Sequence, residues 1–351
     1  MVIGMYKSFE IRNFRGFRRF RIEGFQRVNL ITGENNVGKT ALLEALFIHC
    51  GAANIRLLFS VENFRGITQF EGGIGPASSG LFQAFDSTHE VVLNGIDKVD
   101  IERLCILKVV PAPITIGQNS GEESSASYGE ALEITFVDSS RNLRVSSRAR
   151  VTKEGLNLDP LPIPPLYQGV YVHTKGADHR VDAERFSNLA KNVGEEEQFV
   201  CALRIVEPSV KVIRLLSHGG MTMLHADVGM GRFLPLPYAG EGMVRLATIL
   251  LAIASSRNGV VLIDEFENGI HYTVLSKIWE AVAEFAERWN AQVFATTHSG
   301  ECVRAAHEVF SGREYVFQLY RLQRGKDGAV EARVFDREAL DAALKSDLET
   351  R

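Results

Sequence analysis

The chain has 351 residues, of which 45% are hydrophobic and 23% charged, a composition typical of a globular protein with one large or two modest domains. Its net charge of −4 excludes an overall attraction to nucleic acid, so any such binding must be local. The N-terminus lacks the layout of a secretory signal, and no apolar run is long enough for a membrane-spanning helix. The cysteines form no C-x-x-C pair, which favours a reducing compartment over a disulfide framework. We therefore expect a cytoplasmic protein with no membrane partner.

Residues 5–32 are predicted to form strands, because Phe20-Arg21-Ile22 alternates between apolar and polar residues and Gly24-Phe25 marks a turn. The segment is basic. Its cations indicate either a surface for a phosphate-bearing ligand, such as a nucleotide or DNA, or a solvated face of a half-buried strand. These cations are Lys7, Arg12, Arg15, Arg18, Arg19, Arg21 and Arg27.

Residues 33–40 read Gly-Glu-Asn-Asn-Val-Gly-Lys-Thr and match the pattern G-x-x-x-x-G-K-[ST]. A β-type run at 28–32 precedes them and a helical run at 41–47 follows, which is the setting that a phosphate-binding loop requires. Glycines let the backbone turn its N–H groups toward phosphate oxygens, and the helix directs its positive dipole end to the same place. Lys39 would reach the β- and γ-phosphates, and the Thr40 hydroxyl would bind Mg²⁺. The residues predicted to bind a nucleoside triphosphate here are Gly33, Asn35, Asn36, Val37, Gly38, Lys39 and Thr40.

A β-rich insertion is predicted over residues 53–168. Residues 89–110 and 131–151 alternate like strands, the polar stretch 117–127 reads as a loop, and a proline-rich segment follows it. The predicted organisation is therefore the first part of an ATPase core at 1–52, the insertion at 53–168, and the second part of the core at 169–351.

The second part of the core begins with a predicted helix at 182–206 and predicted strands over 210–236. The turn Gly240-Glu241-Gly242-Met243 then opens an apolar helix that runs to residue 254. A glycine turn at a helix N-terminus can bind an anion, although glycine turns are common.

Residues 260–263, Val-Val-Leu-Ile, predict a buried parallel strand. Asp264 and Glu265 follow it, at the strand end where open α/β sheets bind ligands. Asp264 is predicted to hold Mg²⁺, and Glu265 to orient or deprotonate the attacking water. His298 follows a second buried strand at 292–297 and is predicted to contact the γ-phosphate, the alternative being a polar strand cap. The remaining predicted elements are a helix at 273–289, a hairpin turned at 326–328 and a helix at 337–345.

Together these motifs resemble those of ATP-binding-cassette ATPases, and more narrowly those of the branch that contains the RecF, SMC and OLD proteins. The likeness lies in Asn13-Phe14-Arg15-Gly16-Phe17, in 33–46, in Ile-Asp-Glu-Phe-Glu-Asn-Gly-Ile-His at 263–271, and in Ala-Thr-Thr-His-Ser at 295–299. It implies an α/β P-loop NTPase fold with an ABC-type ATPase head and an N-terminal antiparallel β subdomain, and it leaves the insertion unexplained.

The resemblance also implies that two subunits close head to tail around two ATP molecules. Gly240, Glu241, Gly242 and Met243 would face the partner's γ-phosphate, and Asn268 and Gly269 would lie at the dimer seam. Gly240 stands where the family has a serine, so a hydroxyl contact to the phosphate is absent. Gln69 and Gln83 are candidates for the glutamine that senses the nucleotide in this family.

Proteins of this branch serve DNA repair, chromosome maintenance and phage defence. We expect an ATPase that forms a homodimer on ATP binding and switches a separate effector, a nuclease or a toxin, in antiviral defence. The alternative is a DNA-binding ATPase of repair or chromosome maintenance. The nucleotide-binding subunit of a membrane transporter is disfavoured by the Asn-Phe-Arg-Gly-Phe start at 13–17, the Glu-Asn-Gly-Ile-His segment at 267–271 and the large β insertion.

OLD-type nucleases carry a Toprim domain after the ATPase. Only 53 residues follow His298 in this 351-residue sequence, which is too few for such a domain. We therefore expect no nuclease activity in the chain itself.

Overall fold

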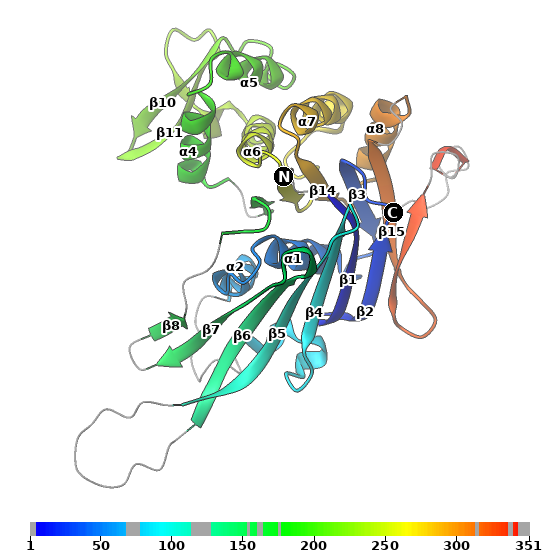
Figure 1. Cartoon of the computed structure of the whole chain (residues 1–351). Helices are drawn as coiled ribbons and strands as arrows, with labels where there is room; N and C mark the ends of the chain where they lie inside the picture. Colours follow the sequence, from blue (N-terminus) through cyan, green and yellow to red (C-terminus); the bar gives the residue numbers. More distant parts are fainter. Residues whose placement is uncertain are drawn as a thin grey trace, which may run out of the picture.

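The computed structural model describes residues 5–67, 78–113, 128–152, 155–159, 164–174, 177–312, 316–335 and 340–342, and the statements below concern these residues. They form the mixed α/β fold that the sequence predicts. A mainly parallel sheet and an antiparallel sheet lie on opposite sides of one buried helix, α1 (Lys39–Cys50) (Figure 1).

The central sheet has six strands in the order β16-β15-β3-β14-β13-β9. All neighbours are parallel except the pair β15–β16. Every residue of β3, β13 and β14 is buried, as expected for parallel strands that are covered on both faces. The strands are β3 (Val28–Gly33), β9 (Gly169–Val172), β13 (Val260–Ile263), β14 (Gln292–Thr296), β15 (Phe317–Arg324) and β16 (Val330–Phe335).

Alternate residues of the parallel strands enter two different cores. Val261 and Ile263 pack on one face with α6, α7 and α8, whereas Val260 and Leu262 pack on the other face with α1. Each fully buried side chain of this size contributes roughly 1.5–3 kcal/mol to folding. The helices are α2 (Arg56–Phe64), beside α1, and α6 (Glu241–Ser255), α7 (Leu275–Arg288) and α8 (Gly300–Phe310) on the opposite face (Figure 1).

The antiparallel sheet has seven strands in the order β2-β1-β4-β5-β6-β7-β8. The strands predicted for the insertion thus continue the N-terminal sheet, because β1 pairs with β4 through registers such as Glu10 opposite Asn94. The domain boundaries near 52 and 168 stay a prediction. The strands are β1 (Tyr6–Phe14), β2 (Phe17–Glu23), β4 (Val91–Asp97), β5 (Glu102–Pro113), β6 (Tyr128–Asp138), β7 (Leu143–Thr152) and β8 (Gly155–Asp159).

A smaller lobe packs on α6, at the upper left of Figure 1. It contains two helices where the sequence pattern predicts one over 182–206, so that expectation was wrong. Gly194, whose φ of 87° is left-handed, interrupts the helical run before α5. The lobe comprises α4 (His179–Leu189), α5 (Glu195–Leu203), β10 (Val212–His218), β11 (Met221–Asp227) and β12 (Leu234–Pro235).

The predicted hairpin at 326–328 joins β15 to β16. The predicted terminal helix at 337–345 and the predicted loop at 117–127 lie wholly or mostly outside the described residues. Among the residues that the structure describes, no helix has the length and apolar character to cross a membrane. Short 3₁₀ turns complete the chain: η1 (Ser79–Leu81), η2 (Gln83–Phe85), η3 (Ser139–Arg141), η4 (Leu236–Ala239) and η5 (Tyr272–Val274).

Candidate functional site

The loop at 33–40 connects the end of β3 to the start of α1, and two of its positions require glycine. A Cβ atom on Gly33 would lie 2.3 Å from the carbonyl oxygen of Leu322, and one on Gly38 would lie 2.8 Å from the Phe17 ring. Both glycines also have positive φ, 139° and 114°, which other residues rarely adopt. Gly38 is the N-cap of α1 and offers no side-chain oxygen to the first turn. The first N–H groups of the helix are therefore available to an anion.

Lys39 lies inside the curve of this loop. Its ammonium donates hydrogen bonds to the carbonyl oxygens of Gly33 at 2.6 Å and Glu34 at 2.8 Å. Burial lowers the pKa of Lys39 to about 8, an effect that the nearby carboxylates of Asp264 and Glu265 oppose. A cation held among backbone groups at a helix N-terminus is suited to bind phosphate.

Thr40 and Asp264, which are 224 positions apart in the chain, meet at the edge of the sheet. The Thr40 hydroxyl lies 3.2 Å and 3.1 Å from the two carboxylate oxygens of Asp264. Thr296, on the neighbouring strand β14, donates to Oδ1 of Asp264 at 2.6 Å, and Tyr171 on β9 donates to Oδ2 at 3.5 Å. Three strands and α1 thus fix the position of this carboxylate.

A hydroxyl and a carboxylate side by side are hard oxygen ligands, which Mg²⁺ prefers. Mg²⁺ commonly takes only one or two protein ligands and completes its shell with phosphate oxygens and water. Within the described residues, no group of three or more His, Cys, Asp or Glu side chains is arranged to hold a metal by itself. Thr40 and Asp264 therefore fit a magnesium ion that arrives with a nucleotide.

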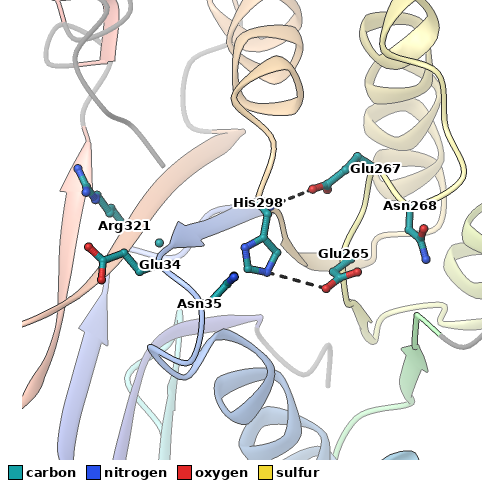
Figure 2. A pocket seen from close by; sticks show the side chains of 8 residues that line it. Glu34, Asn35, Glu265, Glu267, Asn268, His298 and Arg321 are labelled. Atoms are coloured by element: carbon teal, nitrogen blue, oxygen red, sulfur yellow. Dashed lines mark hydrogen bonds and ion pairs between the residues drawn. The ribbon is translucent and has the colours of Figure 1, made fainter.

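Glu265 and His298 come from the ends of adjacent strands, and their side chains lie next to one another in the lining of a cavity of about 610 Å³ (Figure 2). His298 Nε2 lies 3.9 Å from Glu265 Oε1, and the main-chain N–H of His298 donates to Glu267 Oε1 at 2.9 Å. Glu265 has a φ of 49°, an uncommon conformation for a glutamate. Its own main-chain N–H donates to the Thr296 hydroxyl at 2.9 Å. The cavity therefore contains a carboxylate held in a defined position and an imidazole within reach of it.

The sequence reasoning missed three residues of this cavity, Glu34, Glu267 and Arg321, although Glu34 lies within the predicted phosphate loop. Glu267 was recognisable from its position two residues after Glu265 in the segment that follows β13. Arg321 lies on β15 opposite Thr32 of β3, and no local pattern indicates that these two strands are neighbours.

Arg245, which the sequence analysis also missed, links the helix that follows the glycine turn to the acidic pair. Its buried guanidinium donates to the carbonyl oxygens of Asp264 at 2.7 Å, Glu265 at 2.8 Å and His173 at 3.0 Å. Burial lowers the pKa of Arg245. Because one side chain holds both carbonyls, Arg245 fixes the backbone from which the Asp264 and Glu265 side chains project.

We expect Arg245→Ala to lower the rate of ATP hydrolysis at least tenfold while changing ATP affinity less than twofold, because the phosphate loop is untouched. Three carbonyls, of which that of Asp264 is buried, would lose their donor, at a cost of about 2 kcal/mol in folding free energy. Arg245→Lys should recover part of the rate, since it keeps the charge and one donor group. Calorimetry of ATP binding and steady-state hydrolysis measure the two effects. A parallel loss of affinity and rate would show general damage rather than positioning.

The glycine turn at 240–243 and the Asn268-Gly269 pair pack against each other. A Cβ atom on Gly242 would lie 3.2 Å from the carbonyl oxygen of Gly269, and Gly269 itself has a φ of 74°. Glu241, Asn268, Gly269 and Arg245 line a second cavity of about 500 Å³. No residue of the phosphate loop is among the described residues that line it. Within one chain, the structure therefore does not bring the glycine turn into the phosphate-loop cavity.

Two sequence expectations need qualification here. The Met243 side chain is fully buried in the core, so only its main-chain N–H can face a ligand. Gln83 lines a separate cavity with Asn13, Asp86 and others, and Gln69 lies outside the described residues. The structure thus places Gln83 outside the phosphate-loop cavity.

Comparison with solved structures finds SMC head domains. The SMC head bound to the C-winged helix domain of ScpA is 14% identical with a TM-score of 0.49, covering 97% of this chain and 99% of that one. The SMC head domain from Thermotoga maritima is 13% identical with a TM-score of 0.46, covering 94% and 99%.

Comparison with curated proteins finds the ATP/GTP phosphatase of Helicobacter pylori, which is 23% identical over 346 residues, covering 90% of each chain. An uncharacterized protein of Methanocaldococcus jannaschii is 35% identical over 74 residues, covering 21% of this chain and 33% of that protein.

Two family models match the sequence. Residues 5–63 match the one described as "AAA ATPase domain". Residues 124–302, just over half of the 351 residues, match the one described as "AAA domain, putative AbiEii toxin, Type IV TA system". The chain therefore belongs to this AAA family, and it is an ATPase of the P-loop class.

Proposed function

We propose that the chain hydrolyses ATP with Mg²⁺, closes head to tail with a second copy around the nucleotide, and thereby switches a separate effector protein. The observation that carries this proposal is the approach of Asp264 to Thr40, at 3.1 Å and 3.2 Å across 224 positions of sequence. Glu265 and His298 line the cavity that also contains Lys39 and Thr40. The Helicobacter pylori relative, named as an ATP/GTP phosphatase, supports hydrolysis of a nucleoside triphosphate.

Each residue of the cavity has a separate part in this reaction. The loop N–H groups and the Lys39 ammonium would hold the β- and γ-phosphates, while Thr40 and Asp264 would hold Mg²⁺. Bound Mg²⁺ would neutralise charge that develops on the phosphate oxygens. Glu265 would accept the proton of the attacking water, and His298 would donate a hydrogen bond to the γ-phosphate.

The head-to-tail dimer is supported by the position of the glycine turn. Glu241, from this turn, lines the second cavity, and Asn268 lines both cavities. A phosphate-binding turn that lies outside the phosphate-loop cavity of its own chain is available to the nucleotide of another copy. Asn268, between the two cavities, would then lie at the contact between the copies.

A separate effector is proposed because the antiparallel sheet has a face that the ATPase chemistry does not use. One face packs on α1, whereas Val92, Ile106, Leu104 and Val137 on the opposite face are only half-buried. These side chains are neighbours in register, Val92 with Ile106 and Leu104 with Val137. A half-buried apolar stripe suits a protein partner. The family description, which refers to a toxin system, supports a role in defence.

The alternative, a DNA-binding ATPase, would use the arginines of the first two strands. Arg12 and Arg19 lie 2.7 Å and 3.3 Å from the same glutamate, Glu10, and Arg21 pairs with Glu23. This pairing reduces the charge that the strands present to a phosphate backbone. DNA binding that weakens steeply with salt would favour the alternative.

We expect the purified chain to hydrolyse ATP only while Mg²⁺ is present, and to leave plasmid DNA intact with Mg²⁺ or Mn²⁺. Removing the metal with a chelator should abolish hydrolysis, because Asp264 and Thr40 alone cannot bridge the phosphates. Plasmid cleavage that is lost on replacing an acid outside the cavity, such as Asp327 or Glu331, would contradict the proposed division between ATPase and effector.

A further inference from the structure

The turn at 78–86 contributes to a cavity beside the phosphate loop. This phosphate-loop cavity, of about 890 Å³, shares Asn35, Glu265 and His298 with the cavity of about 610 Å³ described above. It is lined by residues 35–41 of the loop and by Gly80, Phe82, Ala84 and Phe85. Ile67, three residues after the end of α2, also lines it. The cavity therefore combines a polar, cationic part with a part rich in apolar side chains.

The tip of this segment has an unusual conformation. Ala84 and Phe85 are consecutive residues with positive φ, 53° and 62°, a left-handed conformation that is costly for residues with a Cβ atom, and a bulky residue there is a clear outlier. Despite this cost, the Phe85 ring is not used for packing, since the residue is 73% exposed. Strained residues that fold stability does not explain are often found at ligand sites. An exposed aromatic ring in a strained turn beside a nucleotide cavity is such a case.

Buried contacts of the residues just before Ala84 hold the turn in place. Leu81 and Phe82 are buried, and Phe82 forms a β-bridge with Phe14. The main-chain N–H of Arg15 donates to the Leu81 carbonyl at 3.1 Å, and its guanidinium donates to the Gly80 carbonyl at 3.0 Å. The turn is thus attached to the end of β1.

The same arginine also connects the turn to the helix that follows the phosphate loop. Arg15 forms ion pairs with Glu44 of α1 at 3.0 Å and with Glu62 of α2 at 2.9 Å. Arg65 pairs with Glu44 at 2.7 Å. Because Glu44 lies one turn after Thr40 on α1, this buried network fixes the turn relative to the phosphate loop.

We propose that Phe85 is the platform on which the base of the bound nucleotide stacks, so that the turn at 78–86 forms the base subsite for a nucleoside triphosphate. This inference rests on the proposed function, because it takes the phosphates to lie in the loop at 33–40. With the phosphates fixed there, the base is the part of the nucleotide that extends to the apolar wall. Every base offers a flat π-face to an aromatic side chain, and such stacking strengthens binding substantially.

Binding of ATP and GTP analogues that resist hydrolysis, and of inorganic tripolyphosphate, tests this assignment by calorimetry with Mg²⁺. Phe85→Ala should weaken both nucleotide analogues by roughly 5- to 100-fold, and should leave tripolyphosphate affinity unchanged because that ligand has no base. Phe85→Trp, which keeps an aromatic ring, should bind both nucleotide analogues about as tightly as the native chain does. Leu156→Ala, which removes an exposed apolar side chain on β8, is the matched control.

Two outcomes would overturn the inference: nucleotide affinity that is unchanged in Phe85→Ala, or an equal loss for tripolyphosphate. Lys39→Ala separates this from a failure of the proposed function. If Lys39→Ala still binds all three ligands, the phosphates do not lie in the loop and the proposed function fails. If Lys39→Ala binds none of them while Phe85→Ala binds normally, only the base subsite is wrong.

Discussion

Replacing Lys39 with alanine is expected to weaken ATP binding by roughly 10- to 100-fold or more, because a charge-assisted hydrogen bond contributes about 1.5–3 kcal/mol. The Lys39 ammonium is buried and lies within 2.8 Å of two carbonyl oxygens of the phosphate loop. Alanine would leave the γ-phosphate without its cation. Calorimetry with ATP and Mg²⁺ measures the effect.

A lysine on the surface provides the control for this substitution. Lys326 lies exposed in the turn between β15 and β16, so Lys326→Ala should bind ATP as the native chain does. Native affinity in a folded Lys39→Ala variant would show that the nucleotide does not bind at the loop.

Replacing Glu265 with glutamine is expected to reduce ATP hydrolysis at least 100-fold while ATP and Mg²⁺ still bind. Glutamine keeps the size of the side chain but cannot accept a proton from water, and a general base typically contributes 10²- to 10⁴-fold to the rate. Asp264 and Thr40 remain in place, so the metal site is unchanged. The variant should therefore hold ATP and accumulate as a closed dimer, which the mass in solution with and without ATP would show.

Glu267→Gln serves as the comparison for this variant. Glu267 lines the same cavity and accepts a hydrogen bond from the main chain of His298, but it is not assigned as the base, so its loss of rate should be smaller. A Glu265→Gln variant that hydrolyses ATP normally and stays monomeric with ATP would refute both the assigned role and the dimer. A dimer that exists without nucleotide would refute only ATP-driven assembly.

The parts of the site that could be predicted from the sequence are those defined by short, continuous sequence motifs. The phosphate loop is one uninterrupted motif between a strand and a helix. The buried strand at 260–263 predicts that Asp264 and Glu265, which follow it, lie at the ligand-binding edge of the sheet. That Asp264 and Thr40 would meet could be inferred only from the rule that ligands bind at the carboxyl ends of parallel strands. The structure brings them within hydrogen-bond distance.

The parts that could not be predicted depend on which distant segments become neighbours. Arg245 donates to carbonyl oxygens 19, 20 and 72 positions away. Every residue type has a main-chain carbonyl, so the sequence does not indicate which residues accept these hydrogen bonds. Arg321 enters the cavity because β15 lies beside β3. Alternation within β4 predicts a strand but not its pairing with β1, since the pattern fixes which side chains share a face and not which strand is adjacent.

The left-handed backbone conformation at two positions could not be predicted from the sequence either. Gly194 sits within a segment whose apolar spacing suits one continuous helix, and only its left-handed φ of 87° shows where the helix is broken. Phe85 belongs to a residue type that favours strands, yet it occupies a left-handed turn because flanking residues are anchored by Arg15.

The proposed head-to-tail closure around ATP implies that hydrolysis requires two copies of the chain. The rate of ATP hydrolysis per subunit as protein concentration rises tests this most directly. A site built from the phosphate loop of one copy and the glycine turn of another predicts a rate per subunit that increases with concentration and then reaches a plateau. A rate per subunit that stays constant from dilute monomer upward would contradict the claim, because one chain would then contain everything the reaction needs.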